Sequence, residues 1–171
     1  GGILLQCIHN GFGLHTFKEE LTGPEYADRF VKELYKRPID YRVNSFVTEI
    51  SKDNNEFDVV YSNQEEGLVK VHAKTIIAAT GRSERTRGEI SMQGDRPSGV
   101  MTAGQAQKYL NLEGYLVGKN VFILGSGDIG LIMARRMKLE GANVLGVAEL
   151  MPYSNGLNRN IVQCLNDLFL E

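Results

Sequence analysis

Three glycines at G-x-G-x-x-G spacing are the part of this sequence whose residue types most clearly suggest chemistry. They follow a short apolar run, residues 121–124, which has the length and composition of a buried parallel strand. Glycines at these positions allow a tight turn and let a pyrophosphate approach the backbone at a helix N-terminus. The spacing therefore predicts a dinucleotide site. The residues expected to hold the pyrophosphate, partly through backbone N–H groups, are Gly125, Ser126, Gly127, Asp128, Ile129 and Gly130.

The residues after the glycines predict the helix and strand that would position this site. Residues 128–140 carry apolar side chains at helical spacing, and Gly141 follows where a helix end favours positive φ. A second strand, residues 143–148, ends at Glu149. A carboxylate there can accept hydrogen bonds from both hydroxyls of an adenosine ribose and would repel a 2′-phosphate. Glu149 is the predicted ribose ligand, and NADH is favoured over NADPH. A structural strand–helix–strand unit without a ligand is the alternative.

Composition and charge exclude several classes of function. The chain has 171 residues, 42% apolar and 23% charged, which suits a packed core in one domain or two partial ones. The net charge of −2 and the lack of a basic face argue against nucleic acid or an anionic membrane as the main partner. The sequence shows neither an apolar run of about 20 residues nor a signal peptide, so a cytoplasmic location is expected.

Cys7 and His9, close together in a glycine-rich segment, could be redox or metal-binding residues. A zinc site needs about four ligands, and the whole chain has 2 cysteines and 3 histidines. We therefore expect no metal site. A buried structural thiol is the commoner role for a cysteine such as Cys7, with reactive chemistry as the alternative.

The segment before the glycine motif predicts a mixed α/β fold. Residues 1–13 suggest a packed loop, and a helix should run from Pro24 to about Tyr35. Short β-branched and aromatic runs then predict one parallel strand followed by an antiparallel meander of three. These runs are residues 39–43, 45–51, 57–61 and 68–73.

Two further elements are expected before the central strand. Residues 74–81 predict a buried strand whose small C-terminal residues would permit close approach by another strand or a ligand. Residues 103–112 predict a short helix. Only one strand–helix unit and a second strand follow the glycines, whereas a doubly wound sheet needs several more. Together with a start at Gly1 instead of methionine and an end at Glu171 within an apparent helix, this indicates an internal piece of a longer protein.

These motifs in series resemble the two-dinucleotide-binding flavoproteins, the pyridine nucleotide–disulfide oxidoreductase-like enzymes. Gly1-Gly2-Ile3-Leu4 is similar to their flavin-side segment, residues 74–81 to their Ala-Thr-Gly strand and residues 125–130 to their second glycine motif. The resemblance implies a partial FAD-type domain with a β-meander in residues 1–95. It implies a partial NAD-binding Rossmann-like domain in residues 96–171. Residues implied to lie along the FAD are Asn10, Val47, Ala79, Thr80 and Gly81.

Residues 9–13 and 84–88, His-Asn-Gly-Phe-Gly and Glu-Arg-Thr-Arg-Gly, resemble a branch of this superfamily. That branch is related to the larger subunits of opine- and amine-oxidising dehydrogenases. Two features depart from the superfamily. The FAD glycine motif that should precede Gly1 is absent, so weak or no FAD binding is expected from this chain alone. Cys7 has no partner at CxxC or CxxxxC spacing, so disulfide reduction is not expected.

The resemblance implies an FAD-dependent oxidoreductase that passes hydride from NADH to FAD, or the reverse. We assign no catalytic acid or base, because no residue in the sequence indicates such a role. The cofactors carry the chemistry, and the protein orients them. A second oxidoreductase subunit or another copy of the chain is the expected protein partner. A docking part of an electron-transfer subunit with vestigial dinucleotide sites is the alternative. The meander and the Ala79-Thr80-Gly81 segment argue against a plain NAD-dependent dehydrogenase, because that class does not need them.

Overall fold

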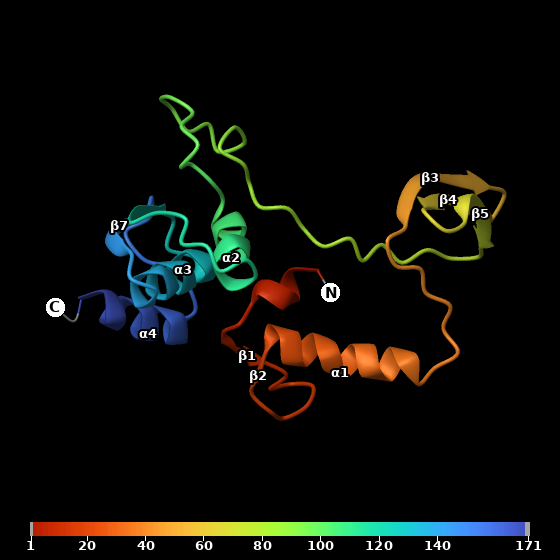
Figure 1. The fold of residues 1–171 in the computed structure, drawn as a ribbon, viewed down its shortest axis with the longest axis horizontal. Coiled ribbons are helices and arrows are strands. Elements are labelled where there is room, and N and C mark those ends of the chain that lie inside the picture. Colours follow the sequence, from red (N-terminus) through yellow and green to blue (C-terminus); the bar gives the residue numbers. More distant parts are fainter. Residues whose placement is uncertain (1, 170–171) are drawn as a thin grey trace. The chain divides into compact units, whose positions relative to one another are not determined.

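The computed structural model describes residues 2–169, which form two compact units (Figure 1). One unit combines Gly1–Arg29 with Ser83–Glu171, and the other is Phe30–Arg82. The mixed α/β architecture, with small antiparallel sheets and one parallel β-α-β unit, agrees with the predicted class. The units differ in range from the predicted cofactor domains, whose assignment stays a prediction. Gly1 of the flavin-side segment and Glu171 of the expected last helix lie outside the described residues.

The parallel unit forms where the glycine motif predicts it. It consists of β6 (Asn120–Leu124), α3 (Asp128–Leu139) and β7 (Asn143–Ala148), and the two strands pair in parallel. Helix α3 packs against both strands, against α2 (Ala103–Asn111) and against α4 (Asn158–Phe169). The helix predicted for residues 103–112 is thereby confirmed. α3 is the central element of this unit.

The hydrophobic core of this unit lies around α3. Leu131 and Ala134 are completely buried. Burying a large apolar side chain such as that of Leu131 stabilises the fold by about 1.5–3 kcal/mol. Five buried residues form the core cluster: Ala106, Leu110, Met133, Met137 and Ala142.

Within residues 2–169, the outer face of the two-stranded sheet is exposed. Phe122 and Leu124 on β6 are 62% and 61% exposed, and Leu145 on β7 is 62% exposed. Successive side chains of a strand point to opposite faces, and the alternate residues Val121 and Val144 pack against the core cluster. The expectation of a fully buried strand at residues 121–124 is therefore wrong for one of its two faces.

The N-terminal segment is bound to α2 through side-chain amides. Its first element is the short 3-10 helix η1 (Gly2–Gln6). Gln6 Nε2 donates to the carbonyl of Gly104 at 2.9 Å and to Gln107 Oε1 at 3.1 Å. Asn111 Nδ2 donates to the carbonyl of Gln6 at 2.8 Å. The predicted packing of this segment is confirmed, but in place of a loop it contains a helical turn and, at Asn10–Phe12, a short strand.

Two short strands and a helix follow. β1 (Asn10–Phe12) pairs with β2 (Leu21–Thr22) in antiparallel orientation. α1 (Gly23–Tyr35) begins directly afterwards and confirms the helix predicted from Pro24 to about Tyr35.

The second unit is built on the predicted antiparallel meander. Its strands β3 (Phe46–Asp53), β4 (Glu56–Asn63) and β5 (Gly67–Ala73) pair in the order β3-β4-β5. The expected parallel strand at residues 39–43 does not form. No described strand pairs with these residues, and a strand needs neighbours for its backbone N–H and C=O groups.

The predicted strand ending in Ala79-Thr80-Gly81 is also wrong. Residues 75–81 have no regular secondary structure, and Ile77 is 91% exposed. The sequence of this segment suits a buried strand, but no strand in the described part of the chain lies alongside it. β-structure depends on such non-local partners, so the local pattern is not sufficient.

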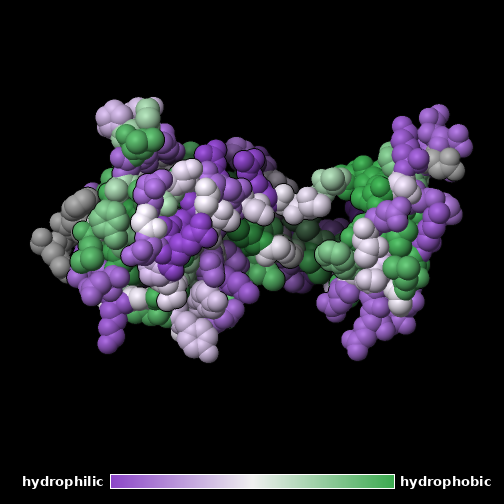
Figure 2. Space-filling model, turned by 90° about the horizontal axis from the view of Figure 1, so that it is seen from above, coloured by the Kyte–Doolittle hydropathy of each residue, from purple (hydrophilic) through white to green (hydrophobic). Residues whose placement is uncertain are grey.

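Apolar and hydrophilic side chains are mixed on the surface in Figure 2. Within residues 2–169, we find no helix with the length and apolar character that crossing a membrane would require.

Candidate functional site

The glycine turn between β6 and α3 has the geometry that its sequence predicts. Gly125 has a φ of +105°, in the left-handed region that favours glycine. A Cβ at Gly130 would overlap the carbonyl oxygen of Gly125 and would also contact Ile123. Gly125 therefore permits the turn, and Gly130 permits close contact between the helix and the strand end.

Gly127 provides an open approach to the start of α3. It is the N-cap residue of α3, and a Cβ built on it would meet no atom within 4 Å. The N-terminus of a helix carries a partial positive charge and backbone N–H groups that point outward. This end of α3 is therefore accessible to an anionic group such as a pyrophosphate.

Glu149 lies at the glycine turn. Its Oε2 accepts hydrogen bonds from the backbone N–H of Ser126 at 2.9 Å and from Ser126 Oγ at 2.6 Å. Its Oε1 accepts from the backbone N–H groups of Leu150 at 2.8 Å and Met151 at 3.2 Å. These donors, above all the Ser126 hydroxyl, lower the pKa of Glu149 to about 2. The carboxylate is therefore ionised at neutral pH, and all four of its contacts come from the chain itself.

Asp128 has a role that the sequence did not reveal. Its Oδ1 accepts hydrogen bonds from the backbone N–H of Leu157 at 2.7 Å and from Asn160 Nδ2 at 2.8 Å. In addition, Ser154 Oγ donates to the carbonyl of Ser126 at 2.7 Å. Asp128 thereby fixes the start of α4 beside the glycine turn. Its neighbour Ile129 packs against the core cluster.

The residues expected along the FAD are divided between the two units. Asn10 belongs to the same unit, but it lines a different cavity. Val47 lies on β3 of the other unit and is 48% exposed. Ala79, Thr80 and Gly81 lie in the exposed irregular segment of that other unit. Their contact with FAD stays a prediction.

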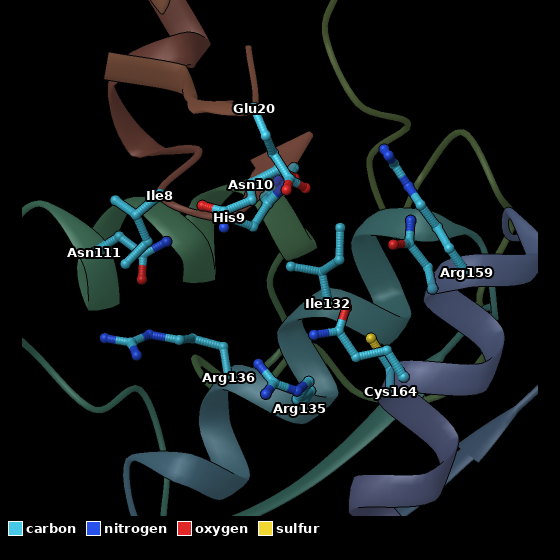
Figure 3. A pocket seen from close by; sticks show the side chains of 12 residues that line it. Ile8, His9, Asn10, Glu20, Asn111, Ile132, Arg135, Arg136, Arg159 and Cys164 are labelled. Carbon is cyan, nitrogen blue, oxygen red and sulfur yellow. The ribbon is translucent and has the colours of Figure 1, made fainter. Parts of the chain in front are cut away.

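A cavity of about 360 Å³ lies between the N-terminal strands and helices α2, α3 and α4 (Figure 3). It was missed in the sequence because its residues come from widely separated segments, and no local pattern connects them. Of these residues, the sequence singled out His9 and Asn10, each for another reason. The lining consists of Ile8, His9, Asn10, Glu20, Asn111, Ile132, Arg135, Arg136, Arg159, Asn160, Gln163 and Cys164.

Both cysteines are buried, and neither forms a disulfide within the described residues. Burial raises the pKa of the Cys7 thiol, and the thiolate is the reactive form. This favours the structural role over the reactive one for Cys7. Within the described residues, no three His, Cys, Asp or Glu side chains form a group that could hold a metal ion.

Comparison with known proteins gives one informative similarity. No family model matches the chain. The sarcosine oxidase subunit alpha of Rhizobium meliloti (strain 1021) is 32% identical to it over 87 residues. The matched segment covers 51% of this chain and 8% of that relative. The chain is thus distantly similar, over half its length, to a small part of one subunit of an oxidoreductase.

Proposed function

We propose that this chain is part of a flavoprotein oxidoreductase and that NADH binds at the turn between β6 and α3. The observation that carries the proposal is the arrangement of the turn itself. Gly125 and Gly130 give it the compact form of a pyrophosphate-binding turn, and Glu149 is ionised beside it. The β6-α3-β7 unit would then be part of a larger Rossmann-like sheet, and its uncovered outer face is compatible with further elements.

Each residue of the turn has a defined role in this proposal. The open backbone at Gly127 and the start of α3 receive the pyrophosphate. Glu149 accepts hydrogen bonds from the adenosine ribose, in exchange for some of its contacts with Ser126, Leu150 and Met151. The bound nicotinamide supplies hydride to a flavin, while the chain provides position and charge.

Two observations support the flavin part of the proposal. The relative is by name an oxidase subunit, and the meander and flavin-side segment resemble those of FAD-binding enzymes. Asn10, Val47, Ala79, Thr80 and Gly81 remain the proposed FAD contacts. A multisubunit enzyme in the cytoplasm is the proposed setting.

The nucleotide preference tests the role of Glu149. We expect the protein to bind NADH roughly tenfold more tightly than NADPH, because the carboxylate accepts from two hydroxyls and repels a 2′-phosphate. Glu149→Gln should reduce this preference by improving NADPH binding relative to NADH. Glu56→Gln, which removes an exposed charge at the start of β4 in the other unit, is the matched control. Tighter NADPH binding by the unmodified protein, or equal selectivity in Glu149→Gln, would refute the assignment.

A second candidate function is a docking or structural role with a vestigial dinucleotide site. The observation in its favour is that Glu149 and Asp128 already accept four and two hydrogen bonds from the chain, respectively. A folded protein whose melting temperature does not change with millimolar NADH would support this candidate. A saturable increase in melting temperature would exclude it, since a ligand that binds the native state stabilises it.

A further inference from the structure

We propose that the cavity between the N-terminal strands and helices α2, α3 and α4 binds a small oxyanion, a free phosphate or carboxylate. The oxyanion would contact Arg159 and Arg136, with Asn111 as an additional polar contact. This site goes beyond the proposed dinucleotide function and does not depend on it.

The side chain of Arg159 fits against the N-terminal segment at Gly11. Its guanidinium lies against the backbone of Gly11, where a Cβ would come within 2.7 Å of Nη2 and 3.1 Å of Cζ. Gly11 has a φ of +119°, so glycine suits this position in both conformation and space. Arg159 stands at the start of α4 beside the cavity (Figure 3). It forms no ion pair with any carboxylate in the part of the chain that the structure describes.

Two buried polar atoms of the lining residues indicate a missing ligand. Asn111 Oδ1, an acceptor, and Arg136 Nε, a donor, have no hydrogen-bond partner among the described residues. Elsewhere on the same side chains, Asn111 Nδ2 donates to the carbonyl of Gln6 and Arg136 Nη2 pairs with Glu140. A buried polar atom without a partner is costly. Hydrogen phosphate can satisfy both atoms, because its unprotonated oxygens accept from Arg136 and its O–H donates to Asn111, whereas an ionised carboxylate can only accept from Arg136.

The charge of the cavity lining favours an anion. Its lining contains three guanidinium groups and one carboxylate, that of Glu20. Guanidinium groups recognise carboxylate and phosphate through paired hydrogen bonds. The volume of about 360 Å³ leaves room for a phosphate or a small carboxylate.

This cavity is distinct from the glycine turn. Its α3 residues are Ile132, Arg135 and Arg136, which follow the residues 125–130 that form the turn. A dinucleotide at the turn and an oxyanion in the cavity should therefore bind together.

Isothermal titration calorimetry with inorganic phosphate and, separately, with malonate tests the proposal. Sodium chloride at matched ionic strength provides the baseline. We expect saturable binding of at least one of these two anions. Arg159→Gln should weaken it by about tenfold or more, as expected for loss of a charge-assisted hydrogen bond. Arg85→Gln removes the same charge from an exposed residue outside the cavity and should leave the affinity within about twofold.

A second measurement does not depend on the folding of a variant. In the unmodified protein, the anion should shift the NMR signals of the Asn111 side-chain amide and the Arg159 guanidinium. The proposal is overturned if neither anion binds saturably, or if these signals do not move. It is also overturned if Arg85→Gln weakens binding as much as Arg159→Gln, since the effect would then be general electrostatics. Displacement of the bound anion by saturating NADH or FAD would likewise overturn it, by making the cavity part of a dinucleotide site.

Discussion

The carboxylate of Glu149 stays ionised without a ligand, because hydrogen-bond donors of the chain itself surround it. Its pKa is lowered to about 2 by the hydroxyl and backbone N–H of Ser126 and by the backbone N–H groups of Met151 and Leu150. Because the folded pKa is below the ordinary value of 4.5, ionised Glu149 stabilises the fold above about pH 4.5. That contribution is lost as the pH falls from about 4.5 toward 2.

The Ser126 hydroxyl should be the main reason for this low pKa. We predict that Ser126→Ala raises the pKa of Glu149 toward 4.5, with the backbone donors keeping it below that value. Ser154→Ala is the matched control, since its hydroxyl donates to the carbonyl of Ser126 and not to Glu149. NMR titration of the Glu149 side-chain carboxyl carbon measures both. An unchanged pKa in Ser126→Ala would mean that the hydroxyl does not hold the carboxylate.

At the scale of elements, the turn from β6 into α3 depends on two glycines for different reasons. Gly130→Ala should destabilise the protein by about 1–3 kcal/mol, because the new methyl group collides with the carbonyl oxygen of Gly125. Gly127→Ala places its methyl group in open space and should cost less than about 1 kcal/mol. Urea unfolding of the two variants gives the comparison. Equal stability of both would contradict the observed close contact between the helix and the strand end.

The elements predicted correctly are those whose patterns are local. α3 has apolar side chains at helical spacing together with its glycines, and the meander β3-β4-β5 has short strands joined by tight turns. Residues 75–81 have an equally strand-like sequence, but a strand also needs a partner that its own sequence does not encode.

The candidate site, like the fold, could be predicted only where its residues lie close together in the sequence. The glycines and Glu149 belong to one continuous segment, so their proximity follows from a strand–helix–strand pattern. The bonds of Asp128 to Leu157 and Asn160 depend on where α4 begins after an irregular loop. The cavity around Arg159 requires contacts between the two ends of the sequence, and no spacing rule connects them.

At the scale of the whole molecule, the chain consists of two units that the structure describes separately. The relative matches it over 87 residues, 8% of the relative's own length. The exposed apolar residues on β6 and β7 and the exposed segment at 75–81 are features that further protein or a cofactor could cover.

Hydrogen exchange should distinguish this exposed segment from the folded units. We predict that amides of residues 75–81 exchange within seconds at neutral pH, whereas those of β4 and α3 are protected by their backbone hydrogen bonds. Mass spectrometry of short labelling times resolves these peptides. Strong protection at residues 75–81 would restore the buried strand that the sequence predicts.

The most direct test of the central claim is to map where NADH binds. Two-dimensional ¹H–¹⁵N NMR spectra of the labelled protein, recorded during titration with NADH, report on every backbone amide. The proposed site predicts saturable shifts concentrated at residues 125–130 and at Glu149, Leu150 and Met151, with β3, β4 and β5 unaffected. Saturable shifts centred elsewhere, or none at millimolar NADH in a folded protein, would contradict a dinucleotide site at the glycine turn.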